Sequence, residues 1–154
     1  MAVRLEIPGR EPLELEHLLL DVNGTLSDRG DLLDGVAERL DALRRTLDLH
    51  LLSADTFGTL EAVAARLGVD SRIVGGGKDK LRLLDGLGRQ RCAAVGNGAN
   101  DRLMIREAAL GIAVVGPEGA SGATVTAADV VCRSILEALD LLADPRALAA
   151  TLRL

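Results

Sequence analysis

The sequence predicts a single α/β domain in which helices cover both faces of a parallel β-sheet. Short apolar runs typical of buried strands alternate along the chain with segments of helical periodicity, and no linker, repeat or low-complexity segment interrupts them. Of the 154 residues, 48% are hydrophobic and 27% are charged, which is enough apolar surface for one core and excludes a disordered chain. We therefore expect one three-layer, doubly wound domain that spans residues 1–154.

The first 22 residues predict a β-hairpin that leads into a buried strand. Apolar and charged residues alternate over 3–7 and 13–16, and residues 18–22 are apolar apart from Asp21. Ligands of such sheets bind beyond the carboxyl ends of the strands, so polar residues that follow an apolar run are candidate site residues. The remaining pattern predicts helices over 36–47, 57–67, 80–87, 102–109 and 135–143, a helical stretch from Pro145, and strands at 49–52, 73–74, 92–95, 112–115 and 130–131.

The composition argues against several classes of partner. Only Phe57 offers an aromatic ring, and 18 basic against 23 acidic residues give a formal net charge of −5. Because nucleic-acid binding depends on cationic surfaces and flat rings, we expect no nucleic-acid partner. No apolar run reaches membrane-spanning length, so we expect a cytoplasmic protein without a membrane partner. Cys92 and Cys132 lie in separate apolar runs and are expected to be buried and unpaired.

Polar residues follow four of the predicted strands. Three of these features have a structural explanation when taken alone: Asp21 and Asn23 suit a turn, Ser53 suits a helix cap, and Lys78 or Lys80 suits a solvated surface. The glycine-rich segments at 75–80 and 96–101 do not match a P-loop or a dinucleotide fingerprint, because Asp stands at a required Ser/Thr or Gly position. The four features carry more weight together, in their order along the chain.

That order resembles the haloacid dehalogenase superfamily. The residues that carry the resemblance are Asp-x-x-Gly-Thr-Leu at 21–26, Ser53, Lys80 and Gly-x-Gly-x-Asn-Asp at 96–101. They are most similar to small soluble members that look like the phosphorylation domain of P-type ATPases, and the resemblance covers essentially the whole chain. It implies a Rossmann-like sheet and a phosphoryl transfer that passes through an aspartyl-phosphate.

The resemblance also implies a role for each motif residue. Asp21 would attack phosphorus, Lys80 would offset negative charge, and Mg²⁺ would be the cofactor, a combination suited to phosphoryl transfer. Lys80 is preferred to Lys78, because Lys80-Leu81 with Leu87-Gly88 is similar to the family's third motif. The implied sets are Asp21, Asn23 and Lys80 for catalysis; Asp21, Asn23 (through its carbonyl), Asn97 and Asp101 for the metal; and Thr25, Ser53, Ala54, Lys80 and Asn100 for the substrate.

Two positions depart from the family pattern. Asn23 stands where most family phosphatases carry an acid/base Asp, and loss of such help typically costs ~10²- to 10⁴-fold in rate. Asn97 stands where a metal-binding Asp is usual, which removes one negative charge. We expect a slow Mg²⁺-dependent phosphohydrolase. The alternative is a catalytically lapsed domain that binds Mg²⁺, phosphate or a protein partner. Dehalogenation is disfavoured, because it would need a closed apolar pocket and the chain has no cap to form one.

The chain leaves no room for a cap domain over this site. Eight residues separate Leu26 from Gly35, and the interval from 53 to 80 holds one predicted helix and one short strand. The expected partner is a small phosphorylated substrate or a phosphoprotein, and a second copy of the chain could cover the open site. Leu148, Leu152 and Leu154 suit either this self-association or a helix packed on its own core.

Overall fold

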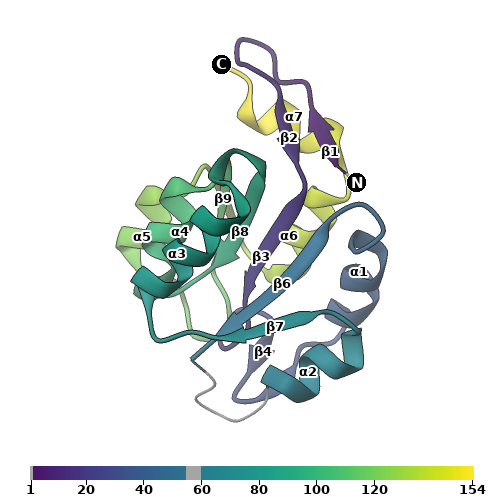
Figure 1. Ribbon diagram of the computed structural model, residues 1–154. Helices are drawn as coiled ribbons and strands as arrows, with labels where there is room; N and C mark the ends of the chain where they lie inside the picture. The colour runs from purple at the N-terminus through teal and green to yellow at the C-terminus, as the bar shows by residue number, and fades with distance from the viewer. Residues whose placement is uncertain (1, 55–59) are drawn as a thin grey trace.

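The computed structural model describes residues 2–54 and 60–154, which form a three-layer α/β domain (Figure 1). Within these residues the central sheet has six parallel strands in the order β10-β9-β8-β3-β6-β7. The predicted fold class is thereby confirmed. The strands of this sheet are β3 (His17–Asp21), β6 (Asp48–Ser53), β7 (Asp70–Ile73), β8 (Cys92–Gly96), β9 (Leu110–Val114) and β10 (Val130–Cys132).

The direction in which the chain fills the sheet reverses at β3. β3 pairs with β6 on one side and with β8 on the other, so the chain fills the sheet outward to β7 and then returns to build the other half. In doubly wound sheets ligands bind where the connections diverge in this way. Asp21 ends β3 and Asn97 follows β8, so both residues lie at this point.

Helices cover both faces of the sheet. Figure 1 shows α3, α4 and α5 gathered on one side and α1, α2 and α6 on the other. Successive side chains of a strand point to opposite faces, so Leu18 and Leu20 pack in one apolar cluster and Leu19 in the other. The helices are α1 (Val36–Leu43), α2 (Leu60–Leu67), α3 (Gly77–Leu87), α4 (Arg102–Glu107), α5 (Gly122–Ala127), α6 (Ile135–Leu142) and α7 (Pro145–Leu152), with 3₁₀ turns η1 (Arg89–Arg91) and η2 (Ala99–Asp101).

Both ends of the chain pack on the domain. The expected N-terminal hairpin is formed by β1 (Val3–Leu5) and β2 (Leu13–Leu15), and α7 lies against β1. Leu148 and Leu152 are buried in the core, whereas Leu154 is exposed. The apolar C-terminal residues therefore mostly pack on their own domain. Cys92 and Cys132 are buried and unpaired, as expected.

Some elements differ from the sequence expectation. A short hairpin of β4 (Ser27–Asp28) and β5 (Asp31–Leu32) follows the first motif, and α5 follows β9; neither was expected. The first helix ends at Leu43 rather than 47, because Thr46 and Leu47 both bond to the Leu43 carbonyl in a closing turn. The second helix is described from Leu60, and Phe57 lies outside the described residues.

None of the described residues builds a cap domain. Between Leu26 and Gly35 the chain forms only the β4–β5 hairpin, and α2 and β7 fill the described part of the interval between β6 and α3. No helix in residues 2–54 and 60–154 combines the length and apolar character that a membrane span needs.

Candidate active site

One lysine between two carboxylates forms the buried centre of the site. Lys80 Nζ lies 3.0 Å from Asp21 Oδ1 and 2.6 Å from Asp101 Oδ1. The three side chains are almost inaccessible to solvent, and they come from α3, the end of β3 and the end of η2. Three segments that are distant in sequence thus meet at the carboxyl edge of the sheet.

This arrangement changes the titration of its members. Burial and the negative charge of Asp101 raise the pKa of Asp21 to about 7, although Lys80 opposes the rise. Burial lowers the pKa of Lys80, but the charges of Asp21 and Asp101 outweigh it, so this pKa is raised above its ordinary value. The lysine is therefore charged at neutral pH, and the centre carries excess negative charge once Asp21 loses its proton.

The structure distinguishes the two candidate lysines. Lys80 is fully buried and bonded to both carboxylates, whereas Lys78 is exposed. Successive helical residues are rotated by about 100°, so side chains two positions apart point to nearly opposite sides. Only one of the two can face Asp21, and it is Lys80.

A threonine hydroxyl links the first and fourth motifs. Thr25 Oγ1 lies 3.1 Å from Asp21 Oδ2 and 3.0 Å from Asn97 Oδ1, and the Thr25 side chain is fully buried. The hydroxyl thus joins the loop after β3 to the loop after β8. Thr25 positions both the candidate nucleophile and a candidate metal ligand.

Asn23 lies beside Ser53 with one atom unsatisfied. Its Nδ2 donates a hydrogen bond to Ser53 Oγ at 2.9 Å. Its Oδ1 is buried and has no hydrogen-bond partner among the described residues. Buried polar atoms are nearly always paired, so this oxygen marks a position where a ligand or a water would donate.

The fourth motif is organised by Asp101. Asp101 Oδ2 accepts the backbone N–H groups of Asn97 at 3.1 Å and Gly98 at 3.0 Å, while Oδ1 accepts from Lys80. Gly96 precedes this loop, and a β-carbon there would overlap with the Asp101 side chain. Both Asp101 oxygens thus have protein partners, and its predicted contact with a metal stays a prediction.

Two predicted substrate-binding residues lie on the surface. Ala54 directly follows β6 and is exposed. Asn100 is also exposed, and its carbonyl oxygen would lie 3.2 Å from a β-carbon at Gly77, so its backbone packs against the start of α3. Neither side chain hydrogen-bonds to the buried centre within the described residues. Their role in substrate binding stays a prediction.

Two residues that the sequence analysis did not single out lie at the site. The Glu118 carboxylate sits against Gly24, and Thr124 Oγ1 donates to the Gly98 carbonyl at 2.7 Å. The only sequence signal for Glu118 is that Gly116-Pro117-Glu118-Gly119 reads as a turn immediately after a predicted strand.

The oxygen atoms at the site fit a magnesium ion. Asp21, the backbone carbonyl of Asn23 and the Asn97 amide offer oxygen ligands, which Mg²⁺ prefers. With Asn at both 23 and 97, the described residues hold no group of three or more His, Cys, Asp or Glu side chains placed to bind a metal. Mg²⁺ commonly binds through one or two carboxylates and retains several waters, so this set, with Asp21 as its one directly available carboxylate, lies at the low end of that range.

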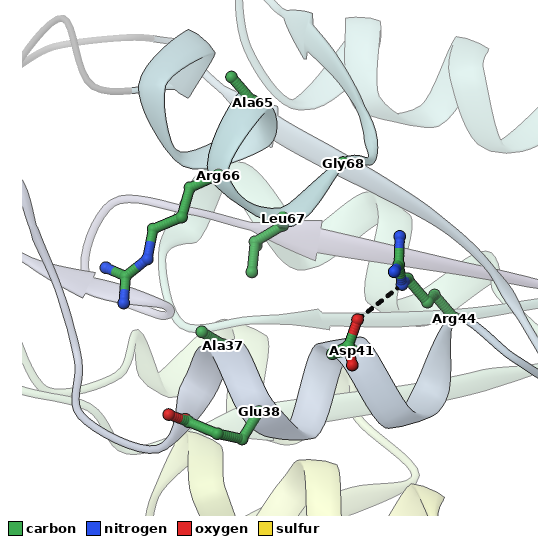
Figure 2. Close-up of a pocket in the computed structure, with 8 residues that line it drawn as sticks. All are labelled: Ala37, Glu38, Asp41, Arg44, Ala65, Arg66, Leu67 and Gly68. Carbon is green, nitrogen blue, oxygen red and sulfur yellow. Dashed lines mark ion pairs between the residues drawn. The ribbon is translucent and has the colours of Figure 1, made fainter.

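A separate cavity of about 440 Å³ lies between α1 and α2 (Figure 2). Charged side chains line it, including the Asp41–Arg44 ion pair, whose Oδ1–Nε distance is 2.8 Å. It contains no residue of the buried centre and none of the predicted site residues. The cavity is therefore distinct from the candidate active site.

Residues 3–109 match the family model described as haloacid dehalogenase-like hydrolase, which covers more than half of the chain. The chain belongs to this family. Among curated proteins, an uncharacterized protein of Methanocaldococcus jannaschii is 42% identical over 78 residues, which are 48% of this chain and 84% of the archaeal protein.

Solved structures of family phosphatases share the fold. The 3-deoxy-D-manno-octulosonate 8-phosphate phosphatase of Moraxella catarrhalis, in complex with magnesium, phosphate and KDO, superimposes with a TM-score of 0.70 at 23% identity, covering 85% of this chain and 87% of that one. A phospho-aspartyl intermediate analogue of phosphoserine phosphatase gives a TM-score of 0.67 at 16% identity, covering 82% of this chain and 98% of that one.

Proposed function

We propose that this haloacid dehalogenase-like protein is a slow, Mg²⁺-dependent phosphohydrolase that acts through an aspartyl-phosphate, an acyl phosphate formed on Asp21. The observation that carries the proposal is the placement of Asp21: it ends the central strand, Lys80 and Thr25 bond to its two oxygens, and the unpaired Asn23 Oδ1 lies in the same loop. The expected substrate is a phosphate monoester on a small molecule or a protein that enters the uncapped site.

These residues suit a transfer of the phosphoryl group in two steps, first to Asp21 and then to water. A carboxylate oxygen of Asp21 bonds to phosphorus while the phosphorus–oxygen bond to the leaving group breaks, and the leaving oxygen takes its proton from solvent. Water then attacks phosphorus, the bond to Asp21 breaks, and phosphate departs while the water proton passes to solvent. Lys80 stabilises the negative charge in both steps. Mg²⁺, when bound at Asp21, Asn23 and Asn97, supplies further positive charge beside the phosphoryl oxygens.

Asn23 is the expected reason for slow turnover. Its amide can orient a leaving group or a water through Oδ1 but cannot transfer a proton at neutral pH. The phosphatase relatives that bind magnesium and phosphate, or mimic a phosphorylated aspartate, support the chemistry by fold only. The amides at positions 23 and 97 are the observation that supports a second candidate, a lapsed domain that binds phosphate without turnover.

Phosphate release from p-nitrophenyl phosphate, measured at high protein concentration with and without Mg²⁺, tests the proposal. We expect slow release that requires Mg²⁺ and disappears in Asp21→Ala. Asn23→Asp should raise the rate, by roughly 10²-fold or more if proton transfer limits turnover.

Phosphate release equal to the blank in the unmodified chain, together with no increase in rate in Asn23→Asp or Asn23→Asp/Asn97→Asp, would reject the proposed phosphohydrolase activity. Phosphate binding that persists in that case would leave the lapsed domain as the function.

A further inference from the structure

A tight turn carries Glu118 to the rim of the site. Gly116 and Gly119 bond to each other in both directions, at 3.3 and 2.9 Å, so Pro117 and Glu118 stand at the tip. The Gly119 carbonyl also accepts Asn97 Nδ2 at 3.2 Å. The turn is therefore fastened to the fourth motif, and the position of Glu118 is set by hydrogen bonds of its neighbours.

Gly24 makes room for the Glu118 carboxylate. A β-carbon at Gly24 would overlap with Glu118 Oε2 and would come within 3.0 Å of the carboxyl carbon and 3.2 Å of Asn97 Nδ2. Gly24 also has a φ of 77°, a left-handed conformation that favours glycine. The carboxylate thus lies against Gly24 of the first motif, and Asn97 Nδ2 approaches the same point.

Glu118 has no structural partner that would explain this placement. Within the described part of the chain its carboxylate makes no ion pair and no hydrogen bond, and its side chain is solvent-exposed. Other glutamates on the surface, such as Glu107 and Glu137, pair with arginines. A carboxylate that lies against Gly24 without a protein partner among the described residues is available to a ligand.

The site is short of negative charge for a divalent cation. Asp101 has Lys80 on one oxygen and two backbone N–H groups on the other, and Asn97 is neutral. Asp21 is then the one carboxylate that would contact the cation directly. Its charge is partly balanced by Lys80, which bonds to both Asp21 and Asp101. Mg²⁺ sites usually hold one or two carboxylates and several waters.

We infer that Glu118 is the second anionic group of the cation site, accepting a hydrogen bond from a metal-bound water and supplying the charge that Asn97 lacks. This inference rests on the proposed function, because it requires a cation at Asp21. Among the described residues no three His, Cys, Asp or Glu side chains lie close enough to bind one metal ion together. Glu118 would therefore act through a water rather than bind the cation directly. It is a positioning residue for the cation.

Metal binding to four variants tests the inference without measuring catalysis. Mn²⁺ is titrated into the intact chain, free Mn²⁺ is measured by electron paramagnetic resonance, and Mg²⁺ competition gives its affinity. Glu118→Gln should weaken both metals by roughly tenfold or more, the usual effect of removing an outer partner of a metal site. The matched control is Glu11→Gln, which makes the same charge change in the exposed loop of the β1–β2 hairpin and should bind like the unmodified chain.

Restoring the carboxylate at position 97 sharpens the test. In an Asn97→Asp background the fourth motif supplies the charge and the Asn97 Nδ2 hydrogen bond that fastens the turn is lost, so Glu118→Gln should cost less than about threefold. The metal-free melting temperature should be unchanged in Glu118→Gln, since the carboxylate has no protein partner among the described residues.

The outcomes separate the inference from the proposed function. Metal affinity in Glu118→Gln within twofold of the unmodified chain, or an equal loss in both backgrounds, would overturn the role of Glu118 and leave the phosphohydrolase intact. An unmodified chain that binds neither Mn²⁺ nor Mg²⁺ at millimolar concentration would overturn both.

Discussion

The central strands β3 and β6 carry polar side chains at both ends, and the two ends differ in whether the fold favours the charged or the neutral form of a basic side chain. At the carboxyl end, Lys80 is buried between Asp21 and Asp101. Toward the amino end, His50 Nε2 lies 3.2 Å from His17 Nδ1, and burial and His17 lower the pKa of His50. At the carboxyl end two carboxylates keep the Lys80 ammonium charged in the core, whereas at the other end burial favours the neutral form of His50. The candidate chemistry lies where a buried cation is retained, which suits stabilisation of a transferring phosphoryl group.

Replacing Lys80 should destabilise the carboxyl end of the sheet and give the largest of the expected changes in the free energy of unfolding. Lys80→Met leaves two buried carboxylates without their cation, which should lower the free energy of unfolding at pH 8 by roughly 3 to 5 kcal/mol. Urea denaturation followed by circular dichroism measures the change. Lys78→Met, two positions away and exposed, is the matched control and should stay within about 0.5 kcal/mol. A loss below about 1 kcal/mol in Lys80→Met would contradict the ionised arrangement.

Replacing Asp21 by an uncharged residue should change the free energy of unfolding by less than Lys80→Met does, and in the stabilising direction. The folded chain keeps a proton on Asp21 up to about pH 7, while the unfolded chain releases it near its ordinary pKa of 3.8. Stability of the metal-free protein therefore falls as pH rises from about 4 to 7, and Asp21→Asn should remove this part of the fall.

At pH 8 with a chelator, we expect Asp21→Asn to be more stable than the unmodified chain by about 1 to 3 kcal/mol, and in a separate assay with Mg²⁺ phosphate release should be lost. Asp31→Asn, an exposed control in β5, should change neither property. Equal pH dependence in Asp21→Asn and the unmodified chain would show that Asp21 titrates normally.

The histidine end should show the smallest effect, with the reverse dependence on pH. Because the folded state lowers the pKa of His50, the unfolded chain binds a proton first as pH falls below about 6.5, and stability falls with it. Asp48 and Asp70 oppose this lowering, and Arg72 adds to it.

His50→Gln should flatten the stability profile between pH 6.5 and 5 by less than about 1 kcal/mol and should leave phosphate release unchanged. Thermal melts across this range measure it. A loss of phosphate release in His50→Gln would show that the two ends of the sheet are coupled.

The two ends also show what the sequence could reveal. Apolar runs predicted the strands, and the polar residues after them gave Asp21, Ser53, Lys80 and Asn97, which the fold brings to one edge. The contact between His17 and His50 was not predicted, because it depends on which strands are neighbours. Periodicity along one strand carries no information about its neighbours.

Short irregular elements escaped prediction for a different reason. The strands of the β4–β5 hairpin have two residues each, too few to show an alternating pattern. Helix α5 is six residues with threonine, valine and glycine, which are weak helix formers. Glu118 lies on the turn that joins β9 to α5, so its approach to Gly24 follows from backbone geometry that no motif encodes.

The Asp101 carboxylate links four positions of the chain, so substitutions at this site differ in how many contacts they disturb. Lys80 and the N–H groups of Asn97 and Gly98 all bond to Asp101, and Gly96 leaves it space. A change at Asp101 or Lys80 disturbs every partner at once and requires compensation. The Asn23 side chain lies outside this group, and its Nδ2 bonds to Ser53. The buried Asn97 side chain bonds to Thr25 and to the Gly119 carbonyl as well, so Asn23→Asp should disturb fewer contacts of the folded chain than Asn97→Asp.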